Sequence, residues 1–120
     1  MNSTKLFIAG YSAECSTWEG NGETEAELRQ CARQAVLDVA PVAPMVTVDG
    51  RALPLEGIET PLMEDIVLPA DNIFGAPAGE PGLSVGFGWV ALVHPLPPGT
   101  HTITDNPTTF TTTIVVEPGA

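Results

Sequence analysis

Prolines and glycines divide this chain into short segments. The sequence holds twelve of each among its 120 residues, and this proline share is about twice the ordinary ~5%. Both residue types favour turns, and proline ends helices because it lacks a backbone N–H. The composition therefore predicts many turns, little continuous helix and a mainly β fold, in a single domain over residues 1–120.

Only residues 24–39 carry the pattern of an amphipathic helix. Thr24 and Glu27 have the spacing of a capping box, in which each side chain bonds a free backbone N–H at the helix start. The apolar residues that follow recur at helical spacing, and Pro41 cannot continue the helix. We therefore predict an N-terminal amphipathic helix that covers one end or one open edge of the β structure.

From residue 45 onward the apolar residues alternate, which is typical of strands. Asp49-Gly50 predicts a tight hairpin turn between two of them. Both faces of residues 85–94 are largely apolar, so that segment is expected at the centre of a sheet. Short strands with frequent turns predict an immunoglobulin-like antiparallel β-sandwich over residues 45–117. The other expected strands are residues 62–68, 83–94, 100–104 and 108–116.

The charge of the chain restricts its partners. Four Lys and Arg against fifteen Asp and Glu give a net charge of −11, which repels nucleic-acid phosphates and anionic membrane surfaces. No apolar run approaches the ~20 residues of a membrane span. The sequence therefore predicts no nucleic-acid partner and no membrane span. Residues 5–13 resemble a signal peptide poorly, because their apolar run is too short.

Two cysteines, Cys15 and Cys31, form an even pair in a short chain. A disulfide between them would tie the N-terminal arm to the helix and stabilise the fold by ~3 kcal/mol. Alternatively, Cys31 is a buried thiol on the apolar helix face. The pair has no CxxC spacing and no suitably placed histidine to complete a zinc set. Both interpretations stay open on the sequence alone.

The loop over residues 69–82 is long for so small a domain and rich in proline and glycine. Its residues Asp71, Asn72 and Glu80 offer oxygen ligands for calcium, although they lack EF-hand spacing. The alternative is that Asp and Asn fix turns by bonding their own backbone. Calcium is the one cofactor that the sequence suggests.

His94 and His101 flank a proline-rich turn. If their strands pair, the two imidazoles could share a transition metal such as zinc, but two histidines without a carboxylate make an incomplete site. Surface or hydrogen-bonded structural histidines are commoner. There is no Gly-x-Ser-x-Gly elbow, and neither histidine lies in a recognised catalytic signature. The sequence therefore predicts that the protein is not an enzyme.

Aromatic and hydroxyl side chains raise the question of a carbohydrate ligand. Trp18 and Trp89 could stack on a sugar, but Trp89 alternates with core residues and is expected to be buried. The threonines between residues 100 and 113 could form a flat hydroxyl ladder for a polysaccharide or ice. Threonine is also an ordinary outward residue of β-strands, which is the favoured interpretation.

Four segments occur in a familiar order: Val48-Asp49-Gly50, Leu68-Pro-Ala-Asp-Asn72, Gly88-Trp89 and Pro95-Leu-Pro-Pro-Gly-Thr-His-Thr-Ile103. Together they resemble uncharacterised bacterial exported proteins with an immunoglobulin-like module, over roughly Cys31 to Val116. The resemblance implies an exported sandwich domain in the cell envelope or extracellular space. It supplies no catalytic residue.

The favoured hypothesis is a non-enzymatic binding or structural module of the bacterial cell envelope or extracellular space, with a protein or carbohydrate ligand. The alternative is a calcium- or zinc-dependent protein or enzyme, with a site formed by residues 69–82 and the two histidines. A third hypothesis is an accessory domain whose partner covers an exposed apolar strand edge. The sequence does not indicate the oligomeric state.

Overall fold

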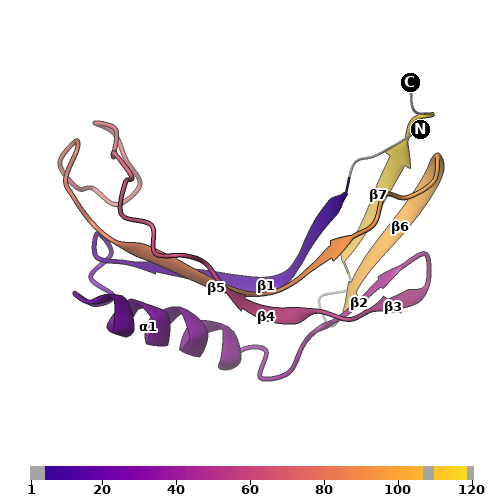
Figure 1. Ribbon diagram of the computed structural model, residues 1–120, viewed down its shortest axis with the longest axis horizontal. Helices are drawn as coiled ribbons and strands as arrows, with labels where there is room; N and C mark the ends of the chain where they lie inside the picture. Colours follow the sequence, from indigo (N-terminus) through magenta and orange to yellow (C-terminus); the bar gives the residue numbers. More distant parts are fainter. Residues whose placement is uncertain (1–4, 107–109, 119–120) are drawn as a thin grey trace. The chain divides into compact units, whose positions relative to one another are not determined.

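The computed structural model describes residues 5–106 and 110–118. It is mainly β, with two antiparallel sheets and one helix (Figure 1), which confirms the predicted composition of the fold. The elements in chain order are β1 (Leu6–Ser16), α1 (Glu25–Leu37), β2 (Met45–Val48), β3 (Arg51–Leu53), β4 (Glu56–Glu59), β5 (Ser84–Val93), β6 (Gly99–Asn106) and β7 (Phe110–Val116).

One sheet has three strands in the order β1-β5-β4, and the other has four in the order β3-β2-β6-β7. The predicted hairpin between β2 and β3 is confirmed, with antiparallel pairing and positive φ at both Asp49 and Gly50. Two positive φ angles at the central residues define the turn that matches strand twist, which is why Asp-Gly serves there. β5 is the central strand of its sheet, as its two apolar faces predicted.

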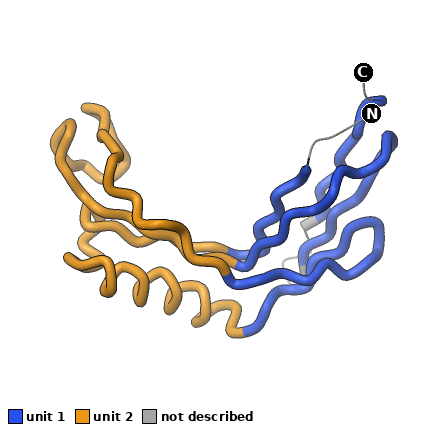
Figure 2. Tube along the Cα trace, in the orientation of Figure 1, with its two compact units in different colours: residues 1–11, 42–57, 89–120 blue, residues 12–41, 58–88 orange. Residues whose placement is uncertain are grey.

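The chain forms two compact units (Figure 2). Unit 1 contains residues 1–11, 42–57 and 89–120, and unit 2 contains residues 12–41 and 58–88. Three of the four boundaries fall inside β1, β4 and β5, so these three strands contribute residues to both units.

The helix of unit 2 begins where the sequence predicts. The Thr24 hydroxyl accepts a hydrogen bond from the Glu27 N–H at 3.2 Å, and a Glu27 carboxylate oxygen accepts one from the Thr24 N–H at 3.1 Å. This capping box satisfies two donors at the helix start. Leu28, Ala32 and Val36 share the buried face of α1 and are at most 1% exposed.

Helix α1 covers a face of the unit 2 part of the three-stranded sheet, whereas the sequence predicted one end or an open edge. Cys31 is joined by a disulfide to Cys15 of β1. The Arg33 guanidinium lies 4.8 Å from the ring centroid of Phe87 in β5, and 3.8 Å from a carboxylate oxygen of Glu59 in β4. These contacts reach all three strands of that sheet (Figure 1).

Two segments differ from their predicted state. Residues 6–16 form β1, although the sequence predicted the β-sandwich only over residues 45–117. Conversely, the strand predicted over residues 62–68 is reduced to one bridge between Met63 and Ser84. Glu64 and Asp65 disfavour strands, which accounts for the early end of this pairing. Thr108 and Thr109, predicted to begin the last strand, lie outside the described residues.

No helix within residues 5–106 or 110–118 combines the length and the apolar character needed to cross a bilayer.

Candidate functional site

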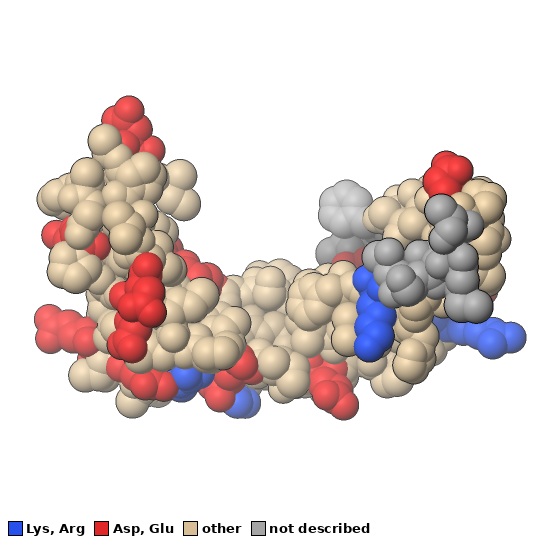
Figure 3. Space-filling view, turned by 45° about the horizontal axis from the view of Figure 1, so that its top comes forward, with Lys and Arg blue, Asp and Glu red and all other residues tan. Residues whose placement is uncertain are grey.

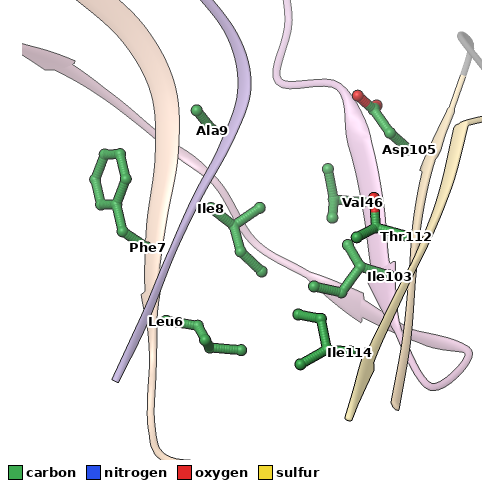
Figure 4. Close-up of a pocket in the computed structure, with 9 residues that line it drawn as sticks. All are labelled: Leu6, Phe7, Ile8, Ala9, Val46, Ile103, Asp105, Thr112 and Ile114. Atoms are coloured by element: carbon green, nitrogen blue, oxygen red, sulfur yellow. The ribbon is translucent and has the colours of Figure 1, made fainter. Parts of the chain in front are cut away.

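Unit 1 contains a cavity of about 310 Å³ between β1 and one face of the four-stranded sheet (Figure 4). Most of its lining side chains are apolar, and Asp105 and Thr112 supply the polar ones. Apolar pockets with a few polar groups are the usual form of a ligand site. The lining residues are Leu6, Phe7, Ile8, Ala9, Val46, Ile103, Asp105, Thr112 and Ile114.

The four-stranded sheet lines this cavity with one face. Ile103 lies opposite Thr112, and Val46 lies opposite Asp105, in the antiparallel registers. Opposite residues share a face, and residues two apart along a strand do too, so these side chains form one surface. We call this surface the floor of the cavity; it consists of Val46, Ile103, Asp105, Thr112 and Ile114.

Strand β1 lines the cavity differently, because it contributes four consecutive residues, Leu6 to Ala9. Successive side chains of a strand point to opposite faces, so one face cannot supply four in a row. Figure 4 shows Leu6 and Ile8 directed toward the floor while Phe7 points away. The backbone of β1 at Phe7 and Ala9 therefore borders the cavity, together with the inward side chains of Leu6 and Ile8.

The interior of unit 1 is incompletely filled around this cavity. Val46 is 1% exposed, but Leu6, Ile8, Ile103 and Ile114 are only half-buried although they face one another. Protein interiors are normally packed with few voids larger than a water molecule. An apolar space of this volume is large enough to receive a ligand, which would bury the half-exposed side chains further.

His101 lies on β6 near the floor and is 8% exposed. Its Nδ1 is 2.6 Å from Oδ2 of Asp49, and its Nε2 is 2.7 Å from the Pro97 carbonyl oxygen. Both partners are acceptors, so the protonated ring, which donates from both nitrogens, satisfies them together. The hydrogen bond to Asp49, and then that to Pro97, raise the pKa of His101.

Asp49 is held in place from two sides. The hydrogen bond from His101 lowers the pKa of Asp49, and the backbone N–H of Thr102, 2.9 Å from Oδ1, lowers it further. The pair fixes the β2–β3 turn to β6. Because both nitrogens of His101 are bonded, the ring could ligate a metal only by breaking one of these contacts.

The other predicted histidine, His94, is exposed just after the end of β5. Among the residues that the structure describes, no group of three or more His, Cys, Asp or Glu could hold a metal ion. The structure therefore does not assemble the two histidines into a recognisable metal site.

Asn72 organises the loop over residues 69–82, in unit 2. Its Nδ2 donates to the carbonyls of Pro69 and Ala76 at 3.0 and 2.8 Å. Its Oδ1 accepts from the backbone N–H groups of Phe74 and Ala76, both at 3.1 Å. The side chain thus bonds its own loop at four points, which is the structural alternative to a calcium ligand.

Asp71 and Glu80, the other two residues suggested for calcium, are exposed. The backbone carbonyl of Glu80 accepts a hydrogen bond from Nε1 of Trp18 at 2.9 Å. Trp18 also stacks on Phe74, with ring centroids 5.7 Å apart and planes inclined by 18°. This aromatic pair anchors the loop. Because Phe74 covers one face of the Trp18 indole, that face cannot stack on a sugar.

The other tryptophan, Trp89, which the sequence predicted to be buried, is half-buried in unit 1. It is not among the residues that line the cavity.

All threonines of β6 and β7 other than Thr112, which belongs to the floor, lie on the face of their sheet opposite the floor. Thr104 lies between Thr47 and Thr111, and Thr102 lies opposite Thr113. The register therefore aligns hydroxyl-bearing side chains in two short rows across neighbouring strands. The sequence had suggested a hydroxyl ladder, but it could not show which strands these rows would cross.

In unit 2, the carboxyl group of Glu14 has a shifted pKa. Glu14 accepts a hydrogen bond from the Ser84 hydroxyl, while Glu19 accepts one from Ser16 at 2.7 Å. Burial, and then the neighbouring Glu19 carboxyl, raise the pKa of Glu14, although the bond from Ser84 opposes this. Two carboxyl groups placed together repel when both are ionised.

The negative charge is concentrated in unit 2. Eleven of the fifteen acidic residues and two of the four basic ones lie there, which gives unit 2 a formal charge of −9 against −2 for unit 1. Figure 3 shows this predominance of acidic side chains. The cavity therefore lies in the less charged unit.

Sequence reasoning missed the cavity residues altogether. Alternation of Leu6 and Ile8 with Phe7 and Ala9 would have identified the strand. Nothing in the sequence shows that this strand would border an apolar space. Comparison of the chain with protein-family models, curated proteins and solved structures found no match.

Proposed function

We propose that this protein is a non-enzymatic binding module of the bacterial cell envelope or extracellular space, and that the cavity of unit 1 is its ligand site. We further propose an immunoglobulin-like sandwich arrangement. Its support is that β1 of one sheet and the floor of the other line the same cavity within unit 1.

The observation that carries the proposal is the unfilled apolar space itself. Four aliphatic side chains, Leu6, Ile8, Ile103 and Ile114, face it while only half-buried. Burying apolar surface stabilises a complex by roughly 25 cal/mol per Å² before the cost of association is subtracted. The space thus favours an apolar ligand, or the apolar side chains of a larger one.

The disulfide between Cys15 and Cys31 supports the proposed location. Structural disulfides persist in oxidising compartments and are rare in the cytosol of mesophiles. The resemblance of the ordered motifs to bacterial exported proteins points the same way.

The ligand site is tested with N-phenyl-1-naphthylamine, a neutral apolar dye whose emission rises in apolar surroundings. We expect saturable binding to the oxidised protein. Ile114→Trp should fill the cavity and abolish the rise in emission without loss of thermal stability, because the larger ring occupies space that is already empty.

The matched control is Val115→Trp, at the neighbouring position of β7. Val115 is 63% exposed and absent from the cavity lining, so this variant should bind the dye like the parent protein. Equal binding by the parent and both variants would place the dye elsewhere and contradict the proposed site.

A further inference from the structure

We infer that the cavity receives an extended peptide strand of a partner protein, apolar at alternate positions and flanked by basic residues, which pairs with the free edge of β1. This inference rests on the proposed function, because it names the occupant of the same cavity.

The position of β1 provides the pairing edge. β1 ends the strand order β1-β5-β4, so it has a paired strand on one side only within the described chain. An edge strand presents a row of backbone N–H and C=O groups that can pair with another chain. Residues 6–9, which border the cavity, belong to this strand.

The floor provides contacts for side chains. A strand added to β1 would lie ~4.8 Å from it and advance ~3.4 Å per residue, so the four bordering residues span roughly 10 Å. Every second side chain of the added strand would point toward Val46, Ile103 and Ile114. Main-chain pairing combined with pockets for alternate side chains is how sheet edges bind peptides.

This arrangement favours a peptide over a lipid chain. A hydrocarbon tail could contact the floor, but it has no donors or acceptors for the edge of β1. Those backbone groups are better satisfied by a strand than left to face an apolar ligand.

Charge favours a separate basic partner over a second copy of this chain. The chain carries a net charge of −11, and Asp105 is the only ionisable residue of the lining. A second copy would bring a further net charge of −11, of which −2 belongs to the unit that holds the cavity, whereas cationic residues flanking the added strand would be attracted by the negative charge of both units.

The inference is tested with a synthetic peptide in which valine and threonine alternate between two terminal lysines. Two further peptides carry N-methyl groups on the valine amides or on the threonine amides. Residues of a strand direct their N–H groups alternately to its two edges, so each set of methyl groups blocks one edge.

We expect the parent peptide to bind and to protect the amides of β1 residues 6–9 from hydrogen exchange. One methylated peptide should lose at least about tenfold in affinity, the equivalent of ~1.4 kcal/mol, while the other binds like the parent. Ile114→Trp should lose peptide binding, and Val115→Trp should keep it.

Three outcomes would overturn the inference. The first is equal affinity of the two methylated peptides, which would exclude edge pairing. The second is a dimer of the protein alone, detected by sedimentation, with residues 6–9 protected from exchange. The third is dye binding without peptide binding, which leaves the proposed function standing and removes only the peptide strand. Loss of both kinds of binding removes the proposed function as well.

Discussion

His101 and Asp49 lie 52 residues apart in the sequence, yet Nδ1 of one is 2.6 Å from Oδ2 of the other. The contact exists because the β2–β3 turn lies beside β6, which pairs with β2. With the Pro97 carbonyl on its other nitrogen, His101 has an acceptor at each end of the ring. His101 is therefore a structural part of unit 1, and its protonated form can donate to both acceptors.

This pair should make stability depend on pH. The pKa of His101 is raised above its ordinary 6.5, so its contribution is complete below about pH 6.5 and is lost as the pH rises through the folded-state value. The pKa of Asp49 is lowered from 3.8, so its contribution is lost only in stronger acid. We expect urea unfolding to show higher stability at about pH 5.5 than at about pH 8.5.

The His101→Gln variant serves as the control for this pH dependence. Glutamine donates from its amide nitrogen only, since its other terminal atom is an acceptor oxygen, and it does not titrate. The variant should therefore be less stable at about pH 5.5 and should lose most of the decline toward pH 8.5. An unchanged decline in the variant would assign the pH dependence to another group.

Glu14 should weaken the fold once it is ionised. Burial and Glu19 raise the pKa of Glu14 above 4.5, so the native state binds this proton more tightly than the unfolded chain does. Its unfavourable contribution is therefore absent below about pH 4.5 and appears as the pH rises through the folded-state value.

The Glu14→Gln variant removes this charge and keeps an oxygen that can accept the hydrogen bond from Ser84. Thermal unfolding at neutral pH should give a higher Tm for the variant, and the difference should vanish near pH 4. A lower Tm at neutral pH would show that the carboxylate is favourable where it lies.

The disulfide should contribute substantially to a chain of this size. Cys15 and Cys31 are 16 residues apart, and closing a loop of about that length contributes roughly 3 kcal/mol in the chain-entropy description. The Cys15→Ser/Cys31→Ser double variant should unfold at correspondingly lower urea concentration. If reduction lowers the midpoint of the parent but not of the double variant, the loss belongs to this bond.

Calcium and zinc should leave the melting temperature unchanged. Asn72 bonds its own loop at four points, and both ring nitrogens of His101 are engaged. A metal at 100 times its Kd would stabilise the fold by about 2.7 kcal/mol, which scanning calorimetry detects readily. A rise in Tm with millimolar calcium that Asp71→Asn removes would restore the metal-site hypothesis.

The sequence predicted the elements whose signals are local. The Thr24–Glu27 capping box located the helix start, and Asp49-Gly50 located a hairpin, because neighbouring residues decide both. β1 was missed because its short apolar run was compared with a signal peptide. The cavity was missed as well, because only the folded structure shows that β1 lies opposite the floor formed by β2, β6 and β7.

For single residues too, local contacts could be predicted from the sequence and contacts between distant strands could not. The sequence offered Asn72 as a calcium ligand, with a turn former as the alternative, and that alternative could be foreseen because its bonds are local. The partners of His101 depend instead on the register between β2 and β6. The sequence offered His101 either as a metal ligand or, more commonly, as a surface or hydrogen-bonded structural histidine. The structure gives it a defined structural bond network that spacing alone could not reveal.

The unit boundaries that cut through β1, β4 and β5 have a consequence for how this chain can change. Each unit is assembled from separate stretches of sequence, so neither can be expressed, duplicated or exchanged as one gene fragment. A deletion that removes one unit also truncates the three strands to which the other unit contributes. The two units must therefore be inherited together, and recombination cannot shuffle the cavity into another protein without the acidic unit and its disulfide.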